Sequence, residues 1–299
     1  MGRHIGSHRG SKSNIQDGSF LDVEVSHDTE GDTRQAEYLS VSKGGDDALC
    51  IAYITVTWPD GGQRSWMGDV GKKCGSHWYP SHTIVDGYDS KPACMWIDGD
   101  QSYGILTEGF GVHITDFTPT QERVDAYNEN PDLICKSKPR FHIYDDLTSD
   151  MYLPFFNPPL EYEPGTLLDI DTSKVFVDGD STGSLPPKKR STPIQRRNGT
   201  ISSNNFMRNR LVSSRDPSQS ARELCDSPTS FGPDFVSYAE GVFCDMLTKE
   251  LWPLCSEQHR AACFDTNTKT MRPGMGIRGR DGSSGREVPE KSYDRTDEW

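Results

Sequence analysis

The sequence predicts a mainly β, sandwich-like fold, followed by a small helical C-terminal subdomain that disulfides hold together. Three observations predict it: short runs of β-branched and aromatic residues before residue 180, helical spacing of apolar residues after residue 217, and eight cysteines divided four and four. Many short strands separated by turn residues are typical of sandwiches and barrels rather than of βαβ units. The 299 residues leave room for one large or two small domains.

Residues 1–46 predict a disordered leader, because they are mostly polar. Only 20–25 alternates apolar and polar residues and could form one short strand. The first 19 residues lack the apolar core of a signal peptide. Three interpretations stay open: the gene model begins late, the leader has been removed, or the protein is cytosolic and its cysteines are reduced.

Residues 47–180 are expected to form a β-rich disulfide domain. Its strongest strand is 50–58, because this run is rich in β-branched and aromatic residues. The turn residues 59–62 and the run 63–67 complete a hairpin. Further strands are expected at 82–85, 93–97, 103–106, 110–115 and 140–144, with weaker pieces at 167–170 and 174–177.

Residues 181–217 predict a flexible basic linker, since positions 181–215 hold eight Lys or Arg and no acidic residue. The dibasic runs 188–190 and 196–197 are sites that a secretory convertase could cut, and Asn198 begins an N-glycosylation sequon. The alternatives are a solvated linker that is not cut, or a nuclear-localisation signal.

Residues 218–270 are expected to be helical. Ser220 and Glu223 have the spacing of a capping box. Apolar residues recur at three and four positions across 234–250, which predicts an amphipathic helix, and a shorter helix is expected over 256–264. Residues 271–299 predict a disordered tail, because they are rich in glycine and charge.

The cysteines predict two disulfides in each half of the chain, with the pairing left open. Closing loops of tens of residues would stabilise the fold by roughly 3–4 kcal/mol each. No pair has the Cys-x-x-Cys spacing of zinc sites, so no metal is expected, and eight reduced cysteines are the alternative. The residues are Cys50, Cys74, Cys94, Cys135, Cys225, Cys244, Cys255 and Cys263.

No catalytic or cofactor-binding residue is predicted, because the sequence has neither a Gly-x-Ser-x-Gly elbow nor a phosphate-binding glycine loop. Asp69, His77 and His82 lie close in sequence, and a hydrogen-bonded loop is favoured over a metal or acid–base site. The Asp-Gly-Asp strings at 98–100 and 178–180 resemble the start of calcium loops, with Glu108 further on, but solvated turns are favoured. His113 and His142 are expected to be exposed or at a sheet edge.

Aromatic residues are dense in the predicted β domain. Trp66, Trp78 and Tyr79 are a possible binding face for a protein or a sugar, although packing in the core is the favoured alternative. The formal net charge of −13 disfavours binding to nucleic acid or to anionic membranes. No apolar run approaches the ~20 residues that a membrane span needs. The oligomeric state stays open.

Several runs of the sequence resemble a group of uncharacterised secreted proteins of filamentous fungi, over residues 45–117 and 222–264. The resemblance implies an extracellular protein and supplies no activity. The chain differs from the group in showing no signal peptide. The runs are Cys-Ile-Ala-Tyr-Ile-Thr-Val-Thr-Trp-Pro-Asp at 50–60, Trp-Met-Gly-Asp-Val-Gly at 66–71, Cys-Gly at 74–75 with Trp-Tyr at 78–79, Cys-Met-Trp-Ile-Asp at 94–98, Glu-Leu-Cys-Asp-Ser at 223–227, Gly-Pro-Asp-Phe-Val at 232–236 and Leu-Trp-Pro-Leu-Cys at 251–255.

Together these features favour a secreted, non-enzymatic protein that binds an unknown protein or glycan target. Whether the chain is an enzyme stays open. The first alternative is a secreted hydrolase acting on glycans through scattered acids such as Asp69, Asp98 or Glu108, since only the spatial separation of two carboxylates matters for that chemistry. The second is an intracellular accessory protein with reduced cysteines.

Overall fold

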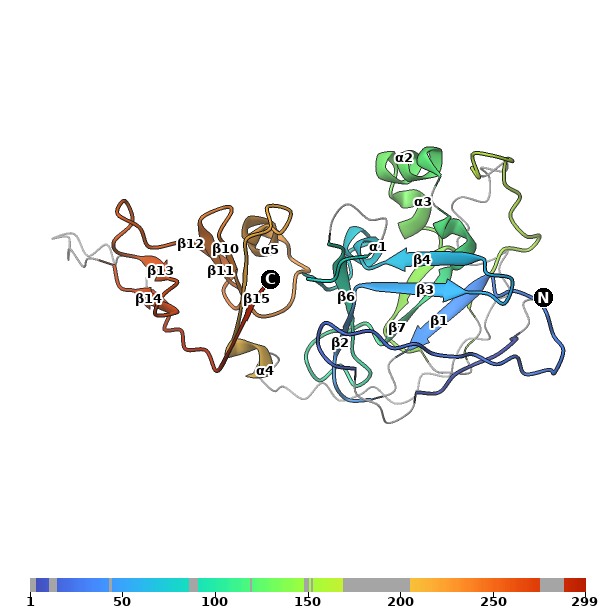
Figure 1. Cartoon of the computed structure of the whole chain (residues 1–299), viewed down its shortest axis with the longest axis horizontal. Coiled ribbons are helices and arrows are strands. Elements are labelled where there is room, and N and C mark those ends of the chain that lie inside the picture. Colours follow the sequence, from blue (N-terminus) through green and yellow to red (C-terminus); the bar gives the residue numbers. More distant parts are fainter. Residues whose placement is uncertain are drawn as a thin grey trace. The chain divides into compact units, whose positions relative to one another are not determined.

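The computed structural model describes residues 4–10, 15–42, 45–85, 91–118, 120–147, 151, 153–168, 205–274 and 288–299. The chain divides into two compact units, which are described separately below (Figure 1). The first comprises Met1–His77 and Pro92–Gly199, and the second comprises Trp78–Lys91 and Thr200–Trp299. The predicted mainly β fold is confirmed, because strands outnumber helices among the described elements. None of the described helices has the length and hydropathy to cross a membrane.

The first unit contains a three-stranded antiparallel sheet in the order β1-β7-β8, a hairpin of β3 and β4, and an antiparallel pair of β2 and β6. The strands are β1 (Tyr38–Ser42), β2 (Leu49–Ile51), β3 (Tyr53–Thr57), β4 (Gln63–Met67), β6 (Ala93–Ile97), β7 (Gly109–His113) and β8 (Phe141–Tyr144). The helices are α1 (Asp69–Lys73), η1 (Ile114–Phe117), α2 (Gln121–Glu129) and α3 (Asp132–Cys135).

The predicted hairpin is confirmed, and its turn forms as the sequence dictates. The Trp58 N–H donates to the Gly62 carbonyl at 2.9 Å, and Gly61 supplies a φ of +86° that L-residues rarely adopt. The predicted strand 50–58 is divided at Ala52, so that β2 and β3 join different sheets.

Other strand predictions have mixed outcomes. The strands at 93–97 and 140–144 are confirmed as β6 and β8, and 110–115 is confirmed as far as His113. The strands at 82–85 and 103–106 are wrong: Ile84 is 80% exposed and lies outside any strand, and Gly104, with a φ of +81°, lies in a turn. No strand forms at 20–25.

The expected disorder of residues 1–46 is wrong for β1. Its residues pair with β7 along five positions, from Tyr38 opposite His113 to Ser42 opposite Gly109. Leu39 and Val41 pack against the core of the unit, so the apolar side chains of this strand stabilise its pairing.

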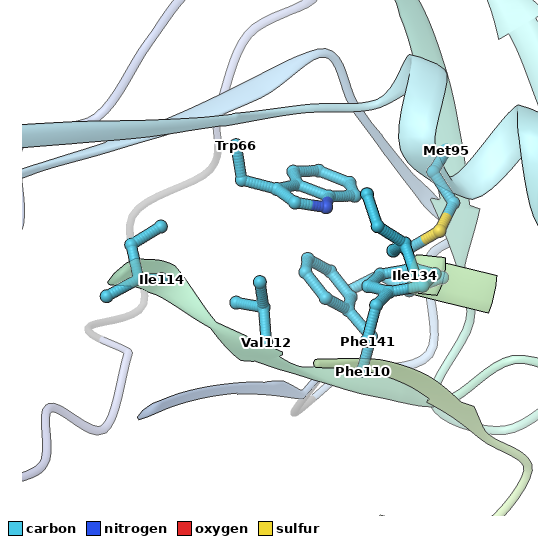
Figure 2. Close-up of a cluster of buried hydrophobic side chains, with 8 residues drawn as sticks. Trp66, Met95, Phe110, Val112, Ile114, Ile134 and Phe141 are labelled. Atoms are coloured by element: carbon cyan, nitrogen blue, oxygen red, sulfur yellow. The ribbon is translucent and has the colours of Figure 1, made fainter. Parts of the chain in front are cut away.

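The core of the first unit is an aromatic cluster between the β3–β4 hairpin and the β1-β7-β8 sheet (Figure 2). The Trp66 ring stacks on Phe110 with centroids 4.6 Å apart and lies 6.0 Å from the Phe141 ring. Helix α1 lies tightly against Met95, since a Cβ added to Gly71 would lie only 2.2 Å from the Met95 sulfur. The fully or nearly buried members of the cluster are Trp66, Met95, Ile97, Phe110, Val112, Ile114, Ile134 and Phe141.

The second unit is a five-stranded sheet in the order β12-β11-β10-β9-β15, with a separate β13–β14 hairpin. Strand β9 pairs in parallel with both β10 and β15, whereas β10, β11 and β12 form an antiparallel meander. The elements are β5 (Trp78–Pro80), α4 (Asn205–Arg208), β9 (Arg210–Ser214), α5 (Ala221–Asp226), β10 (Asp234–Ser237), β11 (Val242–Asp245), β12 (Glu250–Pro253), β13 (Cys263–Asp265), β14 (Thr270–Arg272) and β15 (Arg295–Glu298).

The predicted helical subdomain is wrong over most of its length, because 234–250 and 256–264 form strands and turns. Only the N-cap of the predicted capping box is confirmed: α5 begins after Ser220, whose hydroxyl accepts the Glu223 N–H at 3.0 Å. Strands also replace expected flexible segments, with β9 in the basic linker and β15 in the tail. The dibasic runs, Asn198 and the second Asp-Gly-Asp string lie outside the described residues.

Two tight turns explain why the helical spacing is misleading. The sequence Asp-x-x-Thr-Lys occurs at 245–249 and again at 265–269, and each copy joins two antiparallel strands. The carboxylates of Asp245 and Asp265 accept the N–H groups two and three residues later, and both lysines adopt a left-handed conformation, with φ near +57°. Short strands interrupted by such turns reproduce the three- and four-residue recurrence of a helix.

Two disulfides form in each half of the chain, as predicted, and none of the cysteines is free. In the first unit one bond joins β2 to β6 and another joins the end of α1 to α3. In the second unit one bond joins α5 to β11, and the other closes the loop before β13. The pairs are Cys50–Cys94, Cys74–Cys135, Cys225–Cys244 and Cys255–Cys263.

Candidate ligand pocket of the second unit

The second unit contains a pocket of about 810 Å³, within the range of small-molecule sites. Three methionines, Met207, Met246 and Met271, contribute to its lining together with Leu247, whose side chain is 54% exposed. Thioethers adapt to ligands of different shape, so these walls suit an apolar group. The polar part of the lining includes Asp234 and Lys291.

The polar part of the pocket originates in the β10–β11 pairing. Phe235 lies opposite Cys244 in this ladder, so the next pair along it is Asp234 and Asp245. Side chains that face each other across two strands lie on the same face of the sheet, and two like charges there destabilise it. Both aspartates are buried, which increases that cost.

Lys291 pairs with both carboxylates. Its ammonium lies 2.8 Å from Asp234 Oδ2 and 2.8 Å from Asp245 Oδ1, so those two oxygens are at most twice that distance apart. The Tyr293 hydroxyl donates to Asp234 Oδ2 at 2.7 Å, and the Met246 N–H donates to Asp234 Oδ1 at 2.8 Å. Asp234 is therefore fully hydrogen-bonded at the edge of the pocket.

Burial raises the pKa of Asp234 above its usual value, and the Lys291 ammonium opposes that rise. Burial also raises the pKa of the Tyr293 hydroxyl, with the Asp234 charge adding to the effect. The tyrosine therefore stays a neutral donor, and the cluster of two carboxylates and one ammonium carries a net charge near −1.

The two carboxylates are close enough for glycoside chemistry, but only one of them reaches the pocket. A glycosidase needs both acids in contact with the sugar. The Asp245 side chain is 1% exposed and does not line the pocket, and Lys291 holds both carboxylates. The described lining also contains no aromatic ring on which a sugar could stack. The arrangement suits binding better than hydrolysis.

The predicted aromatic face is not exposed. Trp66 is 0% exposed, and Trp78 and Tyr79 are each 3% exposed. The Trp78 indole N–H donates to the Ser227 hydroxyl at 3.0 Å. The Tyr79 hydroxyl donates to the Pro233 carbonyl at 3.0 Å, and its ring contacts Gly232 behind the pocket lining. All three side chains are thus packed, as the favoured alternative predicts.

The predicted acid–histidine loop is not a metal site. Asp69 accepts the Ala93 N–H at 3.1 Å, and the His82 ring stacks on Trp299 with centroids 5.7 Å apart. Across the described parts of the chain, no three His, Cys, Asp or Glu side chains come together as metal ligands.

A second polar cluster, in the first unit, also fails as a catalytic site. His113 was expected to be exposed, but it is 4% exposed, and its Nδ1 lies 2.9 Å from Asp116 Oδ2. Arg140 and Tyr162 donate to the other oxygen of Asp116 at 2.9 and 2.8 Å. The expectation fails because β7 is the central strand of its sheet and Asp116 satisfies the imidazole.

The contacts of Thr115 with His113 and of His113 with Asp116 resemble a catalytic triad, but their geometry does not suit proton transfer. The Thr115 hydroxyl lies 2.8 Å from Nε2 and 3.4 Å from Nδ1 of His113. A hydroxyl bonded to Nε2 in the ring plane would be much farther from Nδ1, so this one lies over the ring face. His113 therefore cannot take its proton as a general base in the usual geometry.

The sequence did not predict the pocket residues, because Lys291 and Tyr293 lie in the expected tail and Asp234 in the expected helix. One signal could have found part of the site: the repeated Asp-x-x-Thr-Lys turn predicts the hairpin that places Asp245. In comparisons with known proteins, no family model, curated protein or solved structure matches this chain.

Proposed function

We propose that the chain is an extracellular, non-enzymatic binding protein that holds a small amphipathic ligand, or an apolar side chain of a partner, in the pocket of the second unit. The extracellular location rests on the four disulfides, since such bonds persist in oxidising compartments. The resemblance of residues 45–117 and 222–264 to secreted fungal proteins agrees with it.

One observation carries the binding function: an apolar, methionine-rich wall stands beside a charged cluster whose groups already bond one another. Such a pocket offers contact area and orienting polar groups without an activated nucleophile or an accessible acid pair. The net negative charge of the cluster disfavours an anionic head group near Lys291 and favours an uncharged acceptor such as a carbonyl or hydroxyl.

The uncharged dye 6-propionyl-2-dimethylaminonaphthalene tests the pocket, because its naphthalene body probes the apolar wall and its carbonyl is an uncharged acceptor. The native protein is expected to enhance dye fluorescence, and L247D is expected to weaken dye binding about tenfold. I84D is the matched control, because Ile84 is an exposed apolar residue of the same unit outside the pocket lining. Cooperative melting of each variant excludes dye uptake by a partly folded state. Equal binding by wild type and L247D would contradict the proposal.

A secreted hydrolase remains the second candidate, because Asp234 and Asp245 approach each other at the pocket edge. Incubation with a panel of oligosaccharides, followed by chromatography, separates the two functions. The binding function predicts no cleavage. Cleavage by the wild type that disappears in D234N would establish the hydrolase instead.

A further inference from the structure

The loop that follows β6 contains a buried carboxylate, one oxygen of which has no hydrogen-bond donor among the described residues. Asp98 is 0% exposed, and its Oδ2 accepts the Tyr103 N–H at 3.1 Å. Its Oδ1 is also buried and has no donor among the described residues. A buried carboxylate oxygen without a donor or cation costs free energy, so this atom points to a missing partner. The expected solvated turn is wrong for Asp98.

The group that faces Asp98 is another acid. The exposed carboxylate of Asp100 lies within hydrogen-bond reach of the Asp98 carboxyl, and it also accepts the Ser102 N–H at 3.0 Å. Two facing carboxylates repel each other, and a cation bound between them removes that repulsion.

The residues around Asp98 and Asp100 add further negative charge, and no ion pair among the described residues compensates it. Burial and the fields of Asp47, Asp98, Asp100 and Asp46 together raise the pKa of the Tyr103 hydroxyl, which places all four acids near it. None of the ion pairs among the described residues involves these four acids. A cation bound from solution would neutralise part of this negative charge and coordinate the buried Asp98 oxygen.

We propose that the carboxylates of Asp98 and Asp100 bind a calcium ion. Calcium takes oxygen ligands only and accepts hydroxyls, carbonyls and water beside carboxylates. Residues 98, 100 and 102 offer Asp, Asp and Ser at every second position, so the Ser102 hydroxyl is the third candidate ligand. Glu108 is not counted as a ligand, because no third acidic side chain joins Asp98 and Asp100 among the described residues; its Oε2 accepts the Leu147 N–H at 3.2 Å.

The ligand set predicts a weak site. Only two carboxylates converge, and no cluster of three acidic, histidine or cysteine side chains exists among the described residues. Water must therefore complete the shell, and a dissociation constant on the order of 10⁻⁴–10⁻³ M is expected, as in extracellular calcium modules. Magnesium demands a stricter octahedron and binds less well there.

Calcium titration of the full-length, oxidised protein after chelator treatment tests the site. Calorimetry is expected to show one site, and about 10 mM Ca²⁺ is expected to raise the melting temperature by a few degrees. D100N is expected to weaken binding at least tenfold. It removes an exposed charge, so it stays folded even where D98N does not. D60N is the matched control, because exposed Asp60 also accepts the N–H two residues later, at 2.9 Å.

Two results with the wild type and D100N would overturn the proposal: no calcium-dependent heat or melting shift in the wild type, or equal binding by D100N and the wild type. Loss of binding in D60N as large as that in D100N would also overturn it, since it would show a general charge effect. The site lies in the first unit and the ligand pocket in the second, so loss of either prediction leaves the other standing.

Discussion

Asp234 and Asp245 face each other across β10 and β11, and the Lys291 ammonium pairs with one oxygen of each carboxylate. The cross-strand register forces two buried charges together, and the bridging lysine comes from a segment more than forty residues later in the chain. The pairing of β10 with β11 and the position of Lys291 are therefore energetically linked. That link gives the pocket its fixed polar edge.

Replacing Lys291 with methionine would leave two facing carboxylates buried without a counter-charge. K291M is expected to lower the free energy of unfolding by about 3–5 kcal/mol, measured by urea denaturation. K269M serves as control, since among the described residues Lys269 donates only to the Thr296 hydroxyl, at an exposed site. K269M is expected to change the free energy of unfolding by less than about 0.5 kcal/mol. Equal losses in the two variants would contradict the bridging role.

The buried Asp116 predicts acid sensitivity in the first unit. Burial alone would raise its pKa, but the bond from His113 and the charges of Arg140 and Arg123 outweigh it and hold the pKa below the usual value. An aspartate whose pKa is depressed by folding stabilises the fold above its unfolded pKa of about 3.9, and that stability is lost as the pH falls through the folded value.

Urea denaturation between pH 3 and pH 7 checks this linkage. The wild type is expected to lose stability on acidification below about pH 4. D116N is expected to be less stable at pH 7 and to lose less on acidification, because the asparagine does not titrate. A D116N curve parallel to that of the wild type would show that Asp116 contributes nothing to the pH dependence.

The disulfides predict unequal stabilisation by loop length. Cys74–Cys135 spans 61 residues and Cys255–Cys263 spans 8. The loop-entropy relation gives about 4 kcal/mol for the long loop and about 2.5 kcal/mol for the short one. Paired Cys→Ser variants, compared by urea denaturation, are expected to follow that order. Native mass spectrometry with a thiol reagent is expected to find no free thiol, and eight free thiols would contradict the oxidised fold.

The Ser220 cap of α5 gives a smaller, local prediction. S220A removes the acceptor of the Glu223 N–H and the donor to Glu240 Oε1 at 2.6 Å. The free energy of unfolding is expected to fall by about 1 kcal/mol. S218A is the control, because Ser218 is exposed and, within the part of the chain that the structure describes, its side chain bonds only to Asp216. A loss in S218A as large as that in S220A would remove the special role of the cap.

The sequence predicts the parts of this fold whose signals are local. The β3–β4 hairpin follows from the β-branched run and the turn residues 59–62, and the start of α5 follows from Ser220 and Glu223. The pocket could not be predicted in this way. Asp234 acquires its environment from a strand register and from Lys291, and neither leaves a trace in the sequence near residue 234.

The incorrect prediction of a helix at 234–250 also shows the limit of local sequence patterns. Apolar residues recur at intervals of three and four positions in a helix, and they do so equally in short strands separated by tight turns. The Asp-x-x-Thr-Lys turn decides between them, through the carboxylate that accepts two backbone N–H groups. Recognising its second copy at 265–269 would have predicted both hairpins.

The central claim is that the pocket of the second unit binds an amphipathic ligand, and methyl NMR of methionine-labelled protein tests it most directly. Titration with the uncharged dye 6-propionyl-2-dimethylaminonaphthalene is expected to shift the methyl signals of Met207, Met246 and Met271, which line the pocket. Met95, fully buried in the core of the first unit, is expected to stay unchanged. If the three pocket signals do not move, or if Met95 moves as much as they do, the account is contradicted.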